Sequence, residues 1–178
     1  MKTLLLFGLF CMPLSLTAQW APFSSLDGRF QIPSPKPMEH QESTVETPMG
    51  AITYHTYFCK PDEGANGNHW FSVSYCDYPE GSVHSDSTAL LEEFFEETIK
   101  ESAFSVNGEV RYVETTDYNG LPGRFWRVDY LNGQAAIKSK AFLLAGRFYV
   151  IQVVSLSGKS ANPDSQRFFD GFKLVVGN

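Results

Sequence analysis

The chain has 178 residues, of which 43% are hydrophobic, 15% aromatic and 19% charged, and its formal net charge is −6. This length and composition suit one globular domain. An acidic chain without a run of Lys or Arg is a poor ligand for nucleic acid or anionic lipid, so we exclude both from the expected partners.

Residues 1–18 have the pattern of a secretory signal peptide: a positive start at Lys2, an apolar run over residues 4–10, and small or polar residues up to Ala18. The apolar run is shorter than the roughly 20 residues that cross a membrane as a helix. We therefore predict cleavage near Ala18, export to the periplasm or out of the cell, and one mature domain over residues 19–178.

The first half of the mature domain is rich in strand patterns. Apolar and polar residues alternate most cleanly over residues 70–76. Pro33 is expected to end the first strand, and the turn residues of 47–50 separate the second strand from the third. The four predicted strands cover residues 29–32, 42–47, 51–59 and 70–76.

One long amphipathic helix follows. Its apolar residues recur at helical spacing and its acidic residues lie opposite them, so one side is expected to pack on a sheet and the other to face outward. Asp86 or Ser87 can cap the first turn. The apolar stripe comprises Leu90, Leu91, Phe94, Phe95, Thr98 and Ile99, and the acidic side comprises Glu92, Glu93, Glu96, Glu97 and Glu101.

The second half reads as a meander of strands. Residues 148–154 are apolar on both faces, which predicts a strand at the centre of a sheet that is covered on both sides. Asn132-Gly133 predicts a tight hairpin that places Arg127 opposite Lys138. The predicted elements are strands over 109–116, 124–131, 134–144, 147–155 and 172–176, a turn cluster over 117–123, and a short helix from Asn162 to Phe169.

A strand covered on both sides and two separated helices indicate an α+β fold. The expected architecture is a three-layer α/β/α sandwich around a mainly antiparallel sheet. No internal repeat or linker divides the mature domain.

Four segments resemble, in their order, a known family. They are residues 70–79 ahead of the amphipathic helix, the Leu-Pro-Gly corner of 119–124, the meander of 140–149, and the closing segment 167–174. Together they are similar to small exported bacterial proteins of the Mog1/PsbP-like superfamily. The resemblance spans nearly all of residues 20–176. It implies a central antiparallel sheet between helices and a binding or assembly role, since members bind a small GTPase or support a photosynthetic complex.

Cys59 and Cys76 remain after cleavage of the signal peptide. In a regular hairpin of their two strands, Cys59 lies opposite a residue near Trp70, about 20 Å along the strand from Cys76. A disulfide requires Cα atoms within roughly 7 Å. We therefore favour two separate buried thiols over a disulfide.

Two charged surfaces are candidate interaction sites. The acidic helix face can hold a cation or dock a basic partner, although a solvated helix face is the favoured interpretation. The hairpin strands carry a mixed charged surface that can contact a partner, although an incompletely covered layer is favoured there. The candidate residues are Glu93, Glu97, Glu101, Arg124, Arg127 and Lys138.

The patterns of catalytic and metal sites are missing from the sequence. The four histidines, His40, His55, His69 and His84, form no HxxxH or HExxH pair, so a zinc site would have to be assembled across strands. There is no G-x-S-x-G nucleophile motif. We predict no cofactor and no bound metal.

These observations predict a non-enzymatic, exported binding or assembly module that contacts a protein partner at the cell envelope. Two alternatives stay open. One is an envelope hydrolase with a site assembled across the sheet, which a deep polar pocket with converging ionisable groups would favour. The other is a carrier of a small ligand or metal ion.

Overall fold

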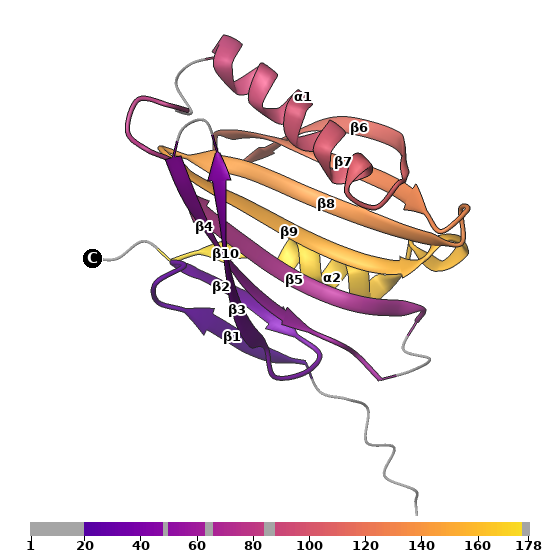
Figure 1. Cartoon of the computed structure of the whole chain (residues 1–178). Coiled ribbons are helices and arrows are strands. Elements are labelled where there is room, and N and C mark those ends of the chain that lie inside the picture. Colours follow the sequence, from indigo (N-terminus) through magenta and orange to yellow (C-terminus); the bar gives the residue numbers. More distant parts are fainter. Residues whose placement is uncertain (1–19, 48–49, 63–65, 84–87, 176–178) are drawn as a thin grey trace, which may run out of the picture.

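A large antiparallel sheet forms the middle layer of the molecule (Figure 1). The computed structural model describes residues 20–47, 50–62, 66–83 and 88–175. The predicted signal peptide and both predicted helix caps, Asp86 and Ser87, lie outside the described residues. Among the described residues, neither helix has the length and hydropathy of a membrane span.

The middle sheet has seven strands, and each pairs with its neighbours in antiparallel register. Its order is β3-β4-β5-β9-β8-β7-β6. The strands are β3 (Glu39–Thr47), β4 (Gly50–Cys59), β5 (Asn68–Asp77), β6 (Glu109–Tyr118), β7 (Leu121–Tyr130), β8 (Ala135–Leu144) and β9 (Arg147–Leu156).

Two predictions about this sheet are confirmed. Strand β9, which contains the doubly apolar run of residues 148–154, lies at the centre of the seven strands. Arg127 pairs with Lys138, as the Asn132-Gly133 hairpin predicted. Asn132 and Gly133 both have φ near the left-handed region, at 53° and 80°, which is the backbone conformation that such a turn requires.

One outer layer is helix α1 (Thr88–Phe104), which packs on one face of the sheet. Leu91, Phe95 and Ile99 of the predicted stripe are buried, and Ala103 extends the stripe by one turn. Leu90 is 49% exposed and stands outside the packed stripe. The predicted helix is therefore present, but fewer of its apolar residues pack against the sheet than the sequence pattern predicted.

The other outer layer corrects the expected α/β/α sandwich. It combines helix α2 (Pro163–Gly171) with a small antiparallel sheet in the order β1-β2-β10. The strands are β1 (Ala21–Ser25), β2 (Phe30–Ser34) and β10 (Lys173–Leu174). The fold is thus richer in sheet than predicted. Residues 21–25, for which no strand was predicted, form strand β1.

Pro33 does not end the strand predicted over residues 29–32, which is β2 in the structure. Strand β2 continues to Ser34, and Pro33 pairs with Pro22 of β1. On its other side β2 contacts β10 only at Gln31 and Phe30, so the missing N–H of Pro33 breaks no bond of that ladder. The turn cluster predicted over residues 117–123 is likewise shorter, because Pro122 and Gly123 already pair within β6-β7.

The two cysteines are free and buried, as predicted. Cys59 belongs to the core between the sheet and the layer of α2, whereas Cys76 belongs to the core under α1. The sheet itself separates the two thiols. Cys59 lies opposite Phe71, one residue from the position expected for a regular hairpin.

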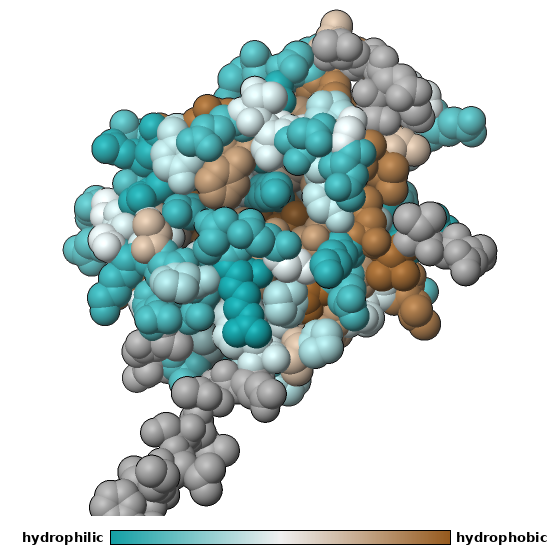
Figure 2. Space-filling view, turned by 180° about the vertical axis from the view of Figure 1, so that it is seen from behind, coloured by the Kyte–Doolittle hydropathy of each residue, from teal (hydrophilic) through white to brown (hydrophobic). Residues whose placement is uncertain are grey.

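Most of one face of the molecule is hydrophilic, with a band of hydrophobic residues along one edge (Figure 2). Scattered exposed apolar residues are normal on a soluble domain. Among the described residues, the large hydrophobic side chains that are most exposed are Leu26, Phe104 and Leu131, at 88%, 79% and 62%.

Candidate functional site

A groove lies between helix α1 and the adjoining part of the middle sheet. Helix α1 packs along β6 and β7, and strands β4, β5 and β9 provide the wall and floor beside it. The groove has a volume of about 660 Å³. Its size lies within the range of ordinary ligand and peptide sites.

The floor of the groove is mainly aromatic and aliphatic. Trp126 of β7, Phe148 and Val150 of β9, and Phe94 of α1 form this surface. Phe94 meets Phe148 edge to face, with ring centroids 4.9 Å apart. Such an edge-to-face arrangement of rings is favourable.

The polar groups of the floor are engaged with one another. Trp126 donates its Nε1–H to Ser102 Oγ at 2.9 Å, and Gln152 donates from Nε2 to Ser139 Oγ at 3.0 Å. Among the described residues, every buried side-chain nitrogen and oxygen atom has a hydrogen-bond partner. The floor therefore offers apolar contact rather than unsatisfied donors or acceptors.

The rim of the groove on the helix side is acidic. Glu97 and Glu101 are exposed, lie one turn apart on α1, and line the groove. Lys100 pairs with Glu97 across 2.6 Å on the helix surface. Among the described residues that line the groove, none is basic. Lys100 compensates the charge of Glu97, but Glu101 leaves the rim with a net negative charge that favours a cationic group on a bound molecule.

Two tyrosines of the groove lining and a nearby cysteine are held neutral. Tyr54 and Tyr78 line it, with their hydroxyl oxygens 3.4 Å apart. Burial raises the pKa of both phenols, and burial together with the negative Asp77 raises the pKa of the nearby Cys76 thiol to about 12. A thiol of that pKa is almost fully protonated at neutral pH and is therefore a poor nucleophile.

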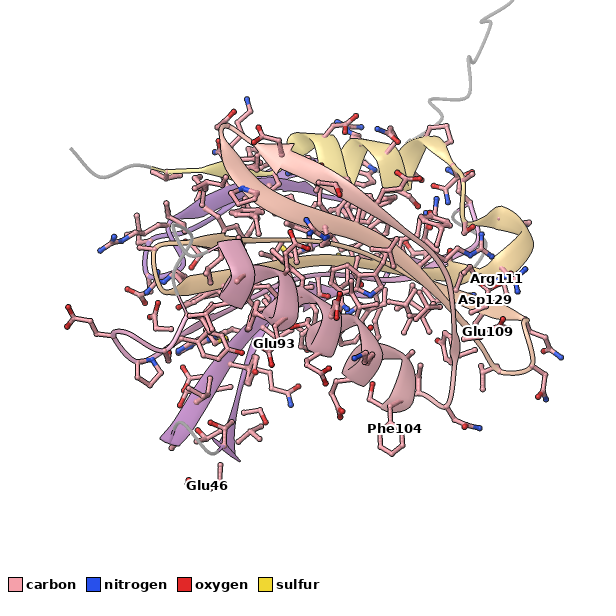
Figure 3. All side chains as sticks on the ribbon, turned by 90° about the horizontal axis from the view of Figure 1, so that it is seen from above. Glu46, Glu93, Phe104, Glu109, Arg111 and Asp129 are labelled. Carbon is pink, nitrogen blue, oxygen red and sulfur yellow. The ribbon has the colours of Figure 1, made fainter. Side chains whose placement is uncertain are left out.

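The acidic candidate residues divide between the groove and the open surface. Glu97 and Glu101 line the groove, whereas Glu93 is exposed on α1 outside the groove lining (Figure 3). The basic candidate Arg124 lies against α1, where it pairs with Glu92 and stacks 5.2 Å above the Phe95 ring. Arg124 thus fastens the helix to the sheet.

Arg127 and Lys138 lie on the opposite face of the sheet from Arg124. The guanidinium of Arg127 donates to Asp129 at 2.6 Å, to Ser160 at 2.8 Å and to Ser157 Oγ at 2.7 Å. These bonds tie the segment after β9 to β7. These contacts of Arg127 are internal to the chain, and the six candidates do not form one surface.

Lys138 lines a smaller hollow of about 340 Å³ beside helix α2. Burial lowers the pKa of its ammonium group, and the positive charge of Arg127 acts in the same direction. The hollow is bordered by Phe125 and Phe169, which meet edge to face.

Two of the four histidines come together across strands. His40 of β3 and His55 of β4 have ring centroids 5.7 Å apart. His69 is exposed on β5 and takes no part in this pair, while His84 lies outside the described residues. The sequence contained a signal for this pair, because the turn predicted over residues 47–50 sets the register of β3 and β4 and so brings His40 and His55 onto neighbouring positions.

The groove itself could not be found from the sequence pattern. Its floor residues come from three separate segments, and their juxtaposition depends on the strand order β4-β5-β9-β8-β7. Local periodicity indicates which face of a strand is apolar, but it does not indicate how far a helix covers that face.

The sequence matches no model of a known protein family and no curated protein. The structure, in contrast, is similar to the solution structure of cyanobacterial PsbP (CyanoP) from Synechocystis sp. PCC 6803. The alignment covers 92% of this chain and 96% of that chain, at 12% identity and a TM-score of 0.59. The chain has a PsbP-like fold. The family resemblance drawn from the sequence is confirmed at the level of this PsbP-like fold.

Proposed function

We propose that this PsbP-like domain is a non-enzymatic interaction module that binds a segment of a partner protein in the groove beside α1. The observation that carries the proposal is the combination of an apolar floor, in which Phe94 and Val150 are half-buried, with an acidic rim at Glu97 and Glu101. A segment that carries apolar side chains next to Lys or Arg complements both parts.

The chemistry of the groove supports binding over catalysis. Its phenols and the adjacent thiol are held protonated, and its indole and amide groups already have partners. Apolar contact contributes about 25 cal/mol per Å² of surface removed from water. Charge complementarity at the rim adds orientation and association rate more than affinity.

The proposed place of action is the periplasm or the outside of the cell. The support for this location is the signal-peptide pattern of residues 1–18, which is an inference from the sequence. A partner encountered there is expected to be an envelope or secreted protein.

The test is site-directed photo-crosslinking in the native host. A photoreactive amino acid at Ser105, which lines the groove, is expected to capture a discrete partner protein. Introducing Glu97→Lys and Glu101→Lys into the same chain should reduce the captured amount at least tenfold, because the rim then repels a basic segment.

A matched control reverses two charges elsewhere. Glu93→Lys on the same helix, combined with Glu80→Lys, changes the net charge equally without touching the groove lining. This variant should capture the partner as the wild type does. Equal loss of capture in both double variants would show that overall charge, rather than the groove, controls the interaction, and would overturn the proposal.

A further inference from the structure

Three potential metal ligands converge on the face of the sheet opposite α1. His40, Glu42 and His55 each offer a ligand atom, and these atoms all lie within 4.8 Å of one another. Glu42 is central: its Oε1 is 3.2 Å from His55 Nδ1 and 3.9 Å from His40 Nε2. Glu42 lies directly opposite His55 in the β3-β4 ladder.

Neighbouring aromatic rings hold both imidazoles in place. The His40 ring stacks on Tyr57 at 4.4 Å, and the His55 ring stacks on Tyr75 at 4.7 Å. The two imidazole planes are within 8° of parallel. Fixing the rings in this way lowers the entropy that is lost when both bind one ion.

The cluster opens into a hollow of about 420 Å³ in which carboxylates outnumber guanidinium groups. Asp77 makes a bidentate pair with Arg147, with two bonds of 2.6 Å, so these two charges compensate each other. The other charged groups that line the hollow are Asp27, Arg29 and Glu42. The three carboxylates exceed the two guanidinium groups by one negative charge, which favours a cation.

Strand β3 places two of these ligands although it contributes little to the core. All its residues from Glu39 to Glu46 are exposed. Polar and charged edge strands also prevent edge-to-edge association. That role accounts for the composition of β3, but it does not require His40 and Glu42 to converge on His55.

We propose that His40, Glu42 and His55 form a binding site for a divalent transition-metal ion of the cobalt-to-zinc series. Two imidazoles and one carboxylate are a ligand set that such ions take in proteins, with metal–nitrogen and metal–oxygen bonds of about 2.0–2.2 Å. Bonds of this length bring ligand atoms closer together than 4.8 Å, so binding requires a small adjustment of the ligand side chains, which the exposed carboxylate of Glu42 can supply while the imidazoles stay stacked. Three protein ligands leave a coordination position for water or for a group of a partner.

The test is titration of the untagged chain with Zn²⁺, followed by calorimetry and by NMR of the imidazole nitrogens. We expect saturable binding of one ion per chain, with shifts at His40 and His55 and none at His69, which serves as an internal control. Ca²⁺ and Mg²⁺ should not compete, because both prefer sites made of oxygen ligands.

Variants separate this site from adventitious binding. His40→Gln and His55→Gln should each weaken Zn²⁺ binding at least tenfold, the double variant should abolish it, and His69→Gln should leave it unchanged. Circular dichroism verifies that the variants are folded. Absence of 1:1 binding in the wild type would overturn the proposal, as would unchanged affinity in the double variant, and either result would leave His40, Glu42 and His55 as neighbouring side chains without a bound ion.

Discussion

Arg127 shows how a single charged side chain can hold two elements together. Its guanidinium reaches Asp129 on its own strand and Ser157 and Ser160 in the segment that leads to α2. The side chains of Arg127 and Asp129 are 18% and 16% exposed. Charged groups in this position depend on their partners, because little water is available to replace them.

Arg127→Ala is therefore expected to lower the free energy of unfolding by about 2 kcal/mol, since it removes hydrogen bonds to a charged donor and leaves hydroxyl groups without a partner. Chemical denaturation followed by tryptophan fluorescence measures this change.

Arg111→Ala is the matched control for this prediction. Arg111 is 52% exposed and lies 3.4 Å from both Glu109 and Asp129, a grouping visible in Figure 3. Exposed ion pairs of this kind contribute about 0–1 kcal/mol. If Arg111→Ala were as destabilised as Arg127→Ala, the half-buried hydrogen bonds of Arg127 would contribute no more to the free energy of unfolding than an exposed ion pair does.

At the scale of elements, helix α1 depends on a few contacts with the sheet. Phe95 is 1% exposed and belongs to the core with Trp126 and Phe148, whereas Phe104 is 79% exposed and projects from the end of the helix (Figure 3). The two residues are chemically identical and lie on one helix, so they differ mainly in burial.

Phe95→Ala is expected to cost about 3–5 kcal/mol of the free energy of unfolding, because it removes buried ring surface and leaves a cavity. Phe104→Ala should change it by less than about 0.5 kcal/mol. Thermal and urea unfolding of both variants measures the difference. Similar losses at the two positions would show that the packing of α1 on the sheet is not as described.

The elements were predictable from the sequence where one local signal was strong. The Asn132-Gly133 turn gave the right register for β7 and β8, and the apolar run of 148–154 gave the central strand. Strand β1 was missed because its partner β2 contains Pro33, and a proline ordinarily indicates the end of a strand. Pro33 is tolerated in β2 because β10 pairs only with Gln31 and Phe30, and the sequence pattern does not indicate this.

The candidate site was less predictable than the elements for a related reason. Glu97 and Glu101 were recognised as charged, but their position at the edge of an apolar groove depends on how far α1 covers the sheet. The pairing of His40 with His55 depends on contact between two strands, and scanning for ligands within one segment does not reveal it. The groove arises from tertiary packing, whereas the histidine pair follows from the register of the β3-β4 hairpin.

At the scale of the whole molecule, the sheet has a protected centre and less protected edges. Strand β9 pairs with β5 and β8, and its residues alternate between the two cores. Strand β3 pairs with β4 alone and is exposed along nearly all its length. The opposite edge strand, β6, also has one sheet partner, but α1 packs against it.

The rate of hydrogen–deuterium exchange of the backbone amides is therefore expected to be highest in β3, lower in β6 and lowest in β9. Backbone amides of residues 147–156 should exchange only through global unfolding, whereas those of 39–47 should exchange through local opening, on the order of 100-fold faster or more. Strand β6 is the informative comparison, because it shares the edge position of β3 and differs in being covered by a helix. If β3 and β6 exchanged at equal rates, cover by α1 would contribute nothing to local stability. If β3 were as protected as β9, the β3-β4 hairpin would open only together with the core, and the two halves of the sheet would unfold as one unit.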